Sequence, residues 1–134
     1  MKRQSVIFFR ILFLLYIIGV MYLCFGNFSD IHGIHRSYFG IPTDKIVHFI
    51  MFFPFPILGN WALGKRPHNW IAGVGTAVLL GVIGFAIAGG TELGQKYLTS
   101  WRMGDFADLK ADCKAILLAT IITVVINIAR SCRK

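Results

Sequence analysis

Residues that could bind ligands or transfer protons are concentrated in three short stretches of an otherwise apolar chain. The stretches are Asp44-Lys45-x-x-His48, Glu92-x-x-Gln95 and Arg102-x-x-Asp105-x-x-Asp108-x-x-x-Asp112. Side chains three or four residues apart share one face of a helix. Each stretch therefore predicts a polar helix face, and the third places its three aspartates within about 60° of arc.

The elements that must carry these faces are membrane helices. Charged residues make up 15% of the sequence and hydrophobic residues 56%, whereas a soluble domain carries about 25% charged residues. Four apolar stretches approach or exceed the roughly 20 residues that cross a bilayer, at 6–26, 46–63, 70–91 and 108–129. We expect an all-α polytopic membrane protein with a single domain over 1–134. Its four transmembrane helices would form an antiparallel bundle at about 5–26, 44–63, 69–95 and 106–129.

The distribution of charge gives the expected orientation. The formal net charge is +8. With a cytoplasmic N-terminus and four crossings, the cytoplasmic side would hold eight basic residues and no acidic one: Lys2, Arg3, Arg10, Lys65, Arg66, Arg130, Arg133 and Lys134. The outer side would hold six basic and six acidic residues, as the positive-inside rule favours. We therefore expect a multi-pass cell-membrane protein with both termini in the cytoplasm, an extracytoplasmic polar cluster and no nucleic-acid partner.

The polar faces should meet at one height. At 1.5 Å per residue, Asp112 would lie about one helical turn below the outer surface, and so would His48. Glu92 and Gln95 would reach the same level from the third helix. Ionisable side chains inside a membrane are costly, so a shared cluster is a functional-site hypothesis by default. The structural alternative is that Asp44 and Asp105 or Asp108 cap helices while Arg102 pairs with Glu92, which leaves the other residues without a role.

Other residues predict how the helices are shaped and packed. Thr43 is expected to cap the second helix, with Asp44 in its first turn, and Pro54 and Pro56 should bend it. The third helix is rich in glycine, and small residues allow close helix contact. Its small stripe of Ala77, Gly81 and Ala88 falls within about 60° of Glu92. The glycine-rich helix could also form an oligomer.

The favoured interpretation includes no metal site and no cofactor, and a divalent cation is left as an alternative. His32 and His35 are three residues apart, but two histidines do not make a metal site. A disulfide between Cys24 and Cys113 could form near the outer face, although buried thiols are the favoured interpretation.

The three motifs together resemble the signature of the VanZ-like membrane proteins, whose type member is associated with low-level resistance to the antibiotic teicoplanin. The resemblance covers about residues 40–120 and keeps the motifs in order. The family usually has an asparagine where this chain has Asp112, and glycines near the positions of Ala115 and Ala119. The resemblance implies a cell-envelope protein linked to antibiotic susceptibility, but it implies no particular reaction.

Three functions fit this pattern, and the favoured one is a binding or modulating protein. Its outward pocket would hold a lipid headgroup, a wall-precursor lipid or a lipoglycopeptide, with Arg102 and Lys45 contacting phosphate or carboxylate groups. The first alternative is a small membrane enzyme acting on a lipid-linked phosphate, acyl or glycosyl group. In that case His48 would be the general base, and Glu92 or Asp108 would be the general acid or would hold a divalent cation.

The second alternative is a membrane partner subunit or an ion pathway. A pathway would need polar groups that continue towards the cytoplasm. The inner halves of the last three expected helices are almost wholly apolar, with only Asn60 and Asn127 near their ends. The binding function therefore remains the favoured prediction, with nine residues expected at the site: Asp44, Lys45, His48, Glu92, Gln95, Arg102, Asp105, Asp108 and Asp112.

Overall fold

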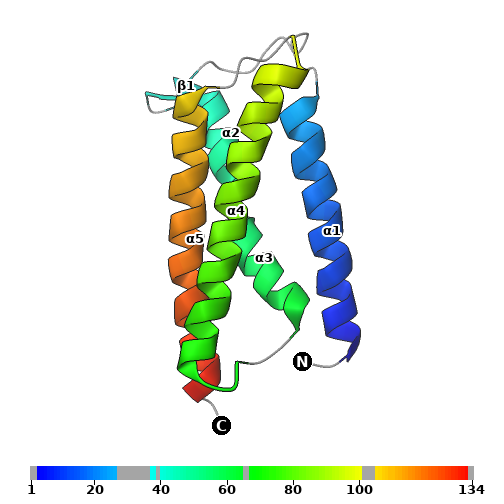
Figure 1. Ribbon diagram of the computed structural model, residues 1–134, viewed down its shortest axis with the longest axis vertical. Coiled ribbons are helices and arrows are strands. Elements are labelled where there is room, and N and C mark those ends of the chain that lie inside the picture. Colours follow the sequence, from blue (N-terminus) through cyan, green and yellow to red (C-terminus); the bar gives the residue numbers. More distant parts are fainter. Residues whose placement is uncertain (1–2, 27–36, 39, 65–66, 101–104, 133–134) are drawn as a thin grey trace.

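The computed structural model describes residues 3–26, 37–38, 40–64, 67–100 and 105–132. Five helices follow one another along the chain: α1 Arg3–Phe25, α2 Thr43–Phe52, α3 Pro54–Leu63, α4 Trp70–Leu98 and α5 Phe106–Cys132. A two-residue strand β1, Ser37–Tyr38, pairs antiparallel with β2, Ile41–Pro42, just before α2. The regular structure of the described residues is otherwise helical, as predicted (Figure 1).

Among the described residues, four helical segments are long and apolar enough to cross a membrane. They are Arg3–Phe25, Thr43–Leu63, Trp70–Leu98 and Phe106–Cys132. Many of their large apolar side chains are exposed, for example Phe8, Leu79 and Val125. An apolar surface of this extent suits a protein surrounded by lipid. The four predicted helices of membrane-spanning length are confirmed, and their bounds differ from the predicted ones by a few residues.

The second span is divided, as its two prolines predict. Helix α2 ends at Phe52 and α3 begins at Pro54. Proline has no N–H to donate to the carbonyl four residues earlier, and its ring crowds that carbonyl. The division lets α2 pack on α5 while α3 packs on both α1 and α5.

The predicted cap of the second span is wrong. Thr43 is the first residue of α2 rather than its cap, and the capping position is taken by Pro42, whose side chain makes no capping hydrogen bond. Asp44 does lie in the first turn, where its negative charge interacts favourably with the positive end of the helix dipole.

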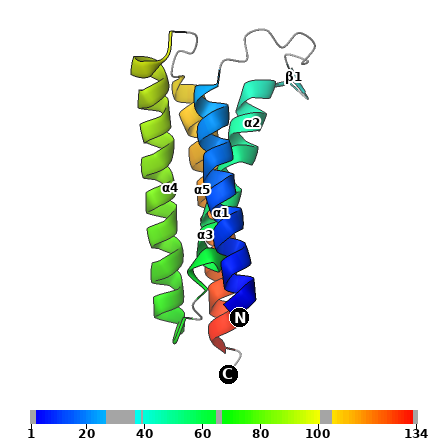
Figure 2. The ribbon, with the colours of Figure 1, turned by 90° about the vertical axis from the view of Figure 1, so that its right-hand side faces the viewer.

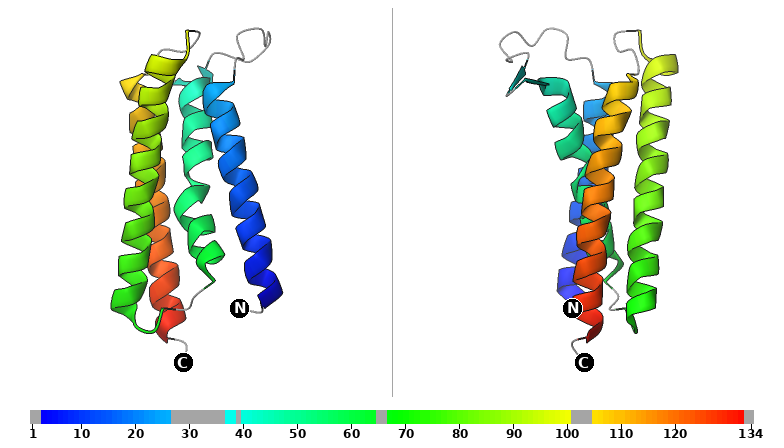
Figure 3. Two further views of the ribbon diagram at one scale, coloured as in Figure 1. Left: turned by 45° about the vertical axis from the view of Figure 1, so that its right-hand side comes forward. Right: turned by 90° about the vertical axis from the view of Figure 1, so that its left-hand side faces the viewer.

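Helix α5 lies between α4 and the α2–α3 segment, and α1 packs mainly on α3 (Figure 3). The starts of α2 and α5 lie at one end of the bundle, together with the ends of α1 and α4 (Figures 1 and 2). We call this the polar end. The start of α1 and the end of α5 lie at the opposite end.

Helices α4 and α5 pack closely because small residues line their interface. Ala77, Ala88, Ala115 and Ala119 are each 0% exposed. Gly81 faces Thr120 of α5, so closely that an added Cβ would lie 2.6 Å from the threonine hydroxyl oxygen. Gly81 is thus used for helix packing within the chain.

A bulky residue at this interface should disrupt the bundle. We expect Gly81→Leu to lower the free energy of unfolding by about 1–3 kcal/mol, because overpacking forces side chains and backbone to shift. Gly75→Leu is the matched control, since an added Cβ there meets nothing within 4 Å. Thermal melting in detergent, followed by circular dichroism, measures both. Equal melting temperatures for the two variants would contradict the close contact.

Buried polar groups also join the helices away from the polar end. The side-chain amides of Asn60 and Asn127 exchange two hydrogen bonds of 3.0 Å each, and Asn127 also donates to the Gly73 carbonyl at 3.1 Å. Arg10 donates from Nε to the Ala62 carbonyl at 3.1 Å. These bonds connect α1 to α3, and α5 to both α3 and α4. They give the two inner asparagines a packing role.

Candidate functional site

Three helices bring most of the predicted site residues together at the polar end. We call the following seven residues the polar cluster: Asp44, Lys45 and His48 of α2, Glu92 of α4, Asp105 just before α5, and Asp108 and Asp112 of α5. His48, Glu92, Asp108 and Asp112 are all buried. Asp44 and Asp105 are more exposed and form the rim.

The deepest part of the polar cluster is a histidine–aspartate pair. His48 is 1% exposed and Asp112 is 0% exposed. The imidazole Nδ1 lies 3.1 Å and 3.3 Å from the two carboxylate oxygens of Asp112. A carboxylate at Nδ1 fixes the orientation of the ring. The arrangement can therefore position His48 as a general base or as a metal ligand.

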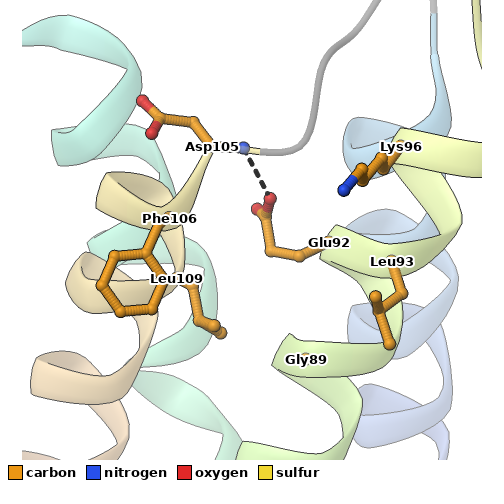
Figure 4. Close-up of a pocket in the computed structure, with 7 residues that line it drawn as sticks. All are labelled: Gly89, Glu92, Leu93, Lys96, Asp105, Phe106 and Leu109. Atoms are coloured by element: carbon orange, nitrogen blue, oxygen red, sulfur yellow. Dashed lines mark hydrogen bonds between the residues drawn. The ribbon is translucent and has the colours of Figure 1, made fainter.

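Glu92 reaches the same place from α4. Its Oε2 accepts a hydrogen bond from the Asp105 backbone N–H at 3.0 Å (Figure 4). Its Oε1 lies 4.0 Å from His48 Nδ1 and accepts no hydrogen bond from the residues that the structure describes. The side chain is only 9% exposed. Glu92 thus brings a buried carboxylate oxygen to the histidine.

Lys45 connects the rim to the buried acids. Its Nζ lies 3.0 Å from Asp108, 3.3 Å from Asp105 and 3.5 Å from Asp44. The side chain is 25% exposed, so the charges are only partly screened by solvent. Lys45 therefore neutralises part of the acidic charge. This engagement leaves it poorly suited to the phosphate-binding role predicted from the sequence.

Asp105 has a structural role as well. Its side-chain oxygen accepts a 2.9 Å hydrogen bond from the Ala107 backbone N–H in the first turn of α5. This bond and the nearby Lys45 ammonium hold the pKa of Asp105 below its ordinary value. The stabilising contribution is fully present above the ordinary pKa of about 3.9 and is lost as the pH falls through the lowered value. The capping part of the structural alternative is thus correct for Asp105.

Of the two remaining predicted site residues, the structure describes only Gln95, which it places outside the polar cluster. Gln95 is buried, but its side-chain amide donates to the Cys24 carbonyl at 2.8 Å and so attaches α4 to the end of α1. Arg102 lies outside the described residues, so its predicted pairing with Glu92 does too. His32 and His35 also lie outside them. Cys24 and Cys113 are not joined by a disulfide.

The polar cluster has the composition of a cation-binding site. Five carboxylates face one lysine and one histidine among the described residues. One ligand atom from each of His48, Glu92 and Asp108 lies within 4.8 Å of the others, so these three could hold a metal ion. The sequence analysis kept a divalent cation at Glu92 or Asp108 only as an alternative, because His48, Glu92 and Asp108 come from three different helices and match no short motif.

Two pockets flank the polar cluster. One, of about 320 Å³, lies between α4 and α5 and is lined by Glu92, Lys96 and Asp105 together with apolar residues (Figure 4). The other, of about 550 Å³, lies between α2 and α5. Its lining is Ile41, Lys45, Ile46, Phe49, Ala107, Lys110, Ala111 and Lys114.

The sequence analysis did not include Lys110 and Lys114 among the site residues, because they point away from the acidic face of α5. They are four residues apart in an apolar helix. Such a spacing in a membrane span is the signal that could have identified them.

Comparison with known proteins adds no family assignment: no protein-family model, no curated protein and no solved structure matches the chain. The resemblance to the VanZ-like proteins therefore stays a prediction.

Proposed function

We propose that this protein is a VanZ-like cell-envelope protein that binds the polar end of an amphiphile at the polar cluster. The amphiphile would be a lipid headgroup, a wall-precursor lipid or a lipoglycopeptide antibiotic. By holding such a molecule the protein would modulate susceptibility to antibiotics that act on the envelope.

One observation carries this proposal: the pocket between α2 and α5 is amphipathic and opens beside the polar cluster. Ile41, Ile46 and Phe49 give it an apolar wall, while Lys110 and Lys114 are exposed on its α5 side. An acyl chain would lie against the apolar wall, and a phosphate or carboxylate would meet the lysines.

The charges of the polar cluster suggest how the ligand would divide its contacts. Lys45 already interacts with three aspartates. A phosphate group of the ligand would therefore contact Lys110 and Lys114 instead. The rim carboxylates of Asp44 and Asp105 would accept hydrogen bonds from hydroxyl or amine groups. A molecule with an acyl chain, an anionic group and sugar or amine donors satisfies all three regions.

Topology supports an outward-facing site. We propose an antiparallel bundle with both termini in the cytoplasm. Arg3, Arg10 and Arg130 lie on the halves of α1 and α5 that are remote from the polar end. The positive-inside rule favours the cytoplasm for these residues, which would place the polar cluster on the extracytoplasmic side of the cell membrane.

Removing the pocket lysines should release the ligand. Each lysine near an anionic lipid contributes about 1 kcal/mol, so Lys110→Gln combined with Lys114→Gln should weaken binding roughly 30-fold. Native mass spectrometry of the full chain, released from its own membranes, measures the bound fraction and the mass of the bound molecule. We expect one defined amphiphile on the wild type and little on the double variant.

Lys96→Gln is the matched control for this experiment. It removes one lysine charge, against two in the double variant, at the same end of the bundle, and Lys96 lines the smaller pocket between α4 and α5. The Lys96→Gln protein should retain the same amphiphile as the wild type, in the same amount. Equal losses in both variants, or the same mixture of lipids on every variant, would count against a specific site between α2 and α5.

The enzyme function is a second candidate because Asp112 orients the buried imidazole of His48. The same mass spectra distinguish it from simple binding. Conversion of the bound amphiphile to a product of different mass during incubation of the wild type, but not of His48→Ala, would establish turnover.

A further inference from the structure

We propose that His48, Glu92 and Asp108 form a three-ligand site for one first-row divalent cation, Zn²⁺ or Mn²⁺. The site goes beyond the proposed amphiphile binding and does not depend on it. It combines one imidazole nitrogen with two carboxylate oxygens, contributed by α2, α4 and α5.

The ligand atoms are close enough to share an ion. One atom from each residue lies within 4.8 Å of the other two, and His48 Nε2 lies 3.8 Å from an Asp108 carboxylate oxygen. Tetrahedral zinc–ligand bonds of about 2.0–2.2 Å place the ligand atoms roughly 3.3–3.6 Å apart, so the most distant pair would have to approach by up to about 1.5 Å. Rotations of the Glu92 and Asp108 side chains can supply a movement of that size.

Each ligand is held through its second polar atom by a different group. Asp112 interacts with His48 Nδ1 at 3.1 Å, so the metal would bind at Nε2, which faces Asp108. A carboxylate on the far nitrogen of a ligating histidine is the usual arrangement in metal sites, because it fixes the tautomer and raises the basicity of the ligand.

The two carboxylates are arranged in the same way, each held through one oxygen while the other is available to the metal. Lys45 binds Asp108 through Oδ1 at 3.0 Å, while Oδ2 is the oxygen near His48. The Asp105 backbone N–H binds Glu92 through Oε2 at 3.0 Å. In each residue one oxygen is anchored and the other lies near the imidazole: Asp108 Oδ2 is 3.8 Å from Nε2, and Glu92 Oε1 is 4.0 Å from Nδ1. Rotation of the Glu92 side chain would bring Oε1 to an ion at Nε2, and the anchored oxygens would preorganise the site.

The second oxygen of Glu92 points independently to a ligand. Glu92 Oε1 is buried, and no described residue donates a hydrogen bond to it. A buried carboxylate oxygen without a hydrogen bond is costly unless a cation or a donor meets it. A divalent ion would supply that partner and would also reduce the repulsion between Glu92 and Asp108.

The type of ligand selects the class of metal. Imidazole nitrogen favours zinc and other first-row transition metals, whereas Mg²⁺ and Ca²⁺ prefer all-oxygen sites. Three protein ligands would leave at least one coordination position for water or a substrate oxygen. Glu92 also lines the pocket between α4 and α5, so that position would be reachable from the pocket.

Metal content of the purified full chain tests the proposal. The protein in detergent is treated with EDTA, incubated with Zn²⁺, Mn²⁺ or Ca²⁺ and desalted. The amount of metal per protein chain is then measured by mass spectrometry. Affinity comes from competition with a chromophoric chelator. We expect about one Zn²⁺ or Mn²⁺ per chain, and Ca²⁺ bound at least ~100-fold more weakly than Zn²⁺.

Variants then separate the three ligands from the rest of the polar cluster. Glu92→Gln and Asp108→Asn should each weaken Zn²⁺ binding by at least ~10-fold, and Asp112→Leu should weaken it by about 10–100-fold. Asp112→Asn should lose less Zn²⁺ affinity than Asp112→Leu, because the asparagine amide oxygen still accepts a hydrogen bond from the Nδ1–H of His48. Asp44→Asn is the matched control, because Asp44 is on the rim and contacts Lys45. The affinity of this variant for Zn²⁺ should stay within about threefold of the wild-type value.

Three results would overturn the proposal. In the first, the wild-type chain retains less than about a tenth of an equivalent of Zn²⁺ or Mn²⁺. In the second, Ca²⁺ binds as tightly as Zn²⁺. In the third, Asp44→Asn loses as much Zn²⁺ affinity as Glu92→Gln. The first two comparisons use wild-type protein, so they decide the matter even if a ligand variant does not fold. Lipid retention is measured separately, so failure of the metal site is distinguishable from failure of the amphiphile proposal.

Discussion

Lys45→Met should lower the free energy of unfolding by about 2–4 kcal/mol, one of the two largest single effects expected in this protein. Removing one partner of a buried ion pair costs about 3–5 kcal/mol, and the partial exposure of Lys45 reduces that figure. The substitution leaves three aspartates close together without their shared cation, and one of them, Asp108, is buried.

A second substitution tests whether charge is the cause. Lys45→Met combined with Asp108→Asn should recover about half of the loss, because the most buried of the three carboxylates is then neutral. Lys96→Met is the control, since Lys96 is exposed and lies over the Tyr97 ring rather than against an acid. Denaturation in detergent followed by circular dichroism gives all three values. A Lys45→Met protein as stable as Lys96→Met would show that the acids are compensated by other groups.

The positions of the polar residues along their helices could be predicted from the sequence. A helix turns by about 100° per residue, so Asp105, Asp108 and Asp112 had to share a face, and so did Asp44 and His48. The length of an apolar span likewise fixes which of its residues lie near an end. Seven of the nine expected residues meet in the structure for these reasons.

The partners within the polar cluster could not be predicted in the same way. Which acid meets His48 depends on how α5 is rotated against α2, and that rotation is set by packing along the whole α4–α5 interface. Gln95 illustrates the limit. Its spacing from Glu92 suggested the same site, yet its amide reaches the Cys24 carbonyl of α1. A backbone carbonyl at a helix end gives no signal in the side-chain pattern.

The apolar residues that line the pockets were invisible for a related reason. In a membrane helix, a leucine that faces lipid and a leucine that faces a pocket look alike in sequence. The division of the second span at its prolines was predictable, but its consequence was not. It moves α2 onto α5 and α3 onto α1, and the larger pocket is formed between α2 and α5.

His48→Phe is the second large expected effect, because Asp112 would be left buried without its histidine. Both side chains are almost fully buried, at 1% and 0% exposed, and a buried charge that loses its partner costs about 3–5 kcal/mol. His68→Phe is the matched control. His68 is exposed in the α3–α4 connection and contacts only Asn69 among the partners described, so its replacement should change stability by less than about 0.5 kcal/mol.

The double variant His48→Phe/Asp112→Leu decides whether the pair is kept for stability or for function. Replacing both members of a buried pair with apolar residues is often neutral or stabilising, so this protein should recover most of the stability that His48→Phe loses. It should nevertheless bind no Zn²⁺, since the nitrogen ligand is gone. A stable double variant without metal would mean that the bundle does not need the pair to fold and that the pair serves the site. A double variant as unstable as His48→Phe would instead make the pair a packing element, and the polar cluster a structural ion network.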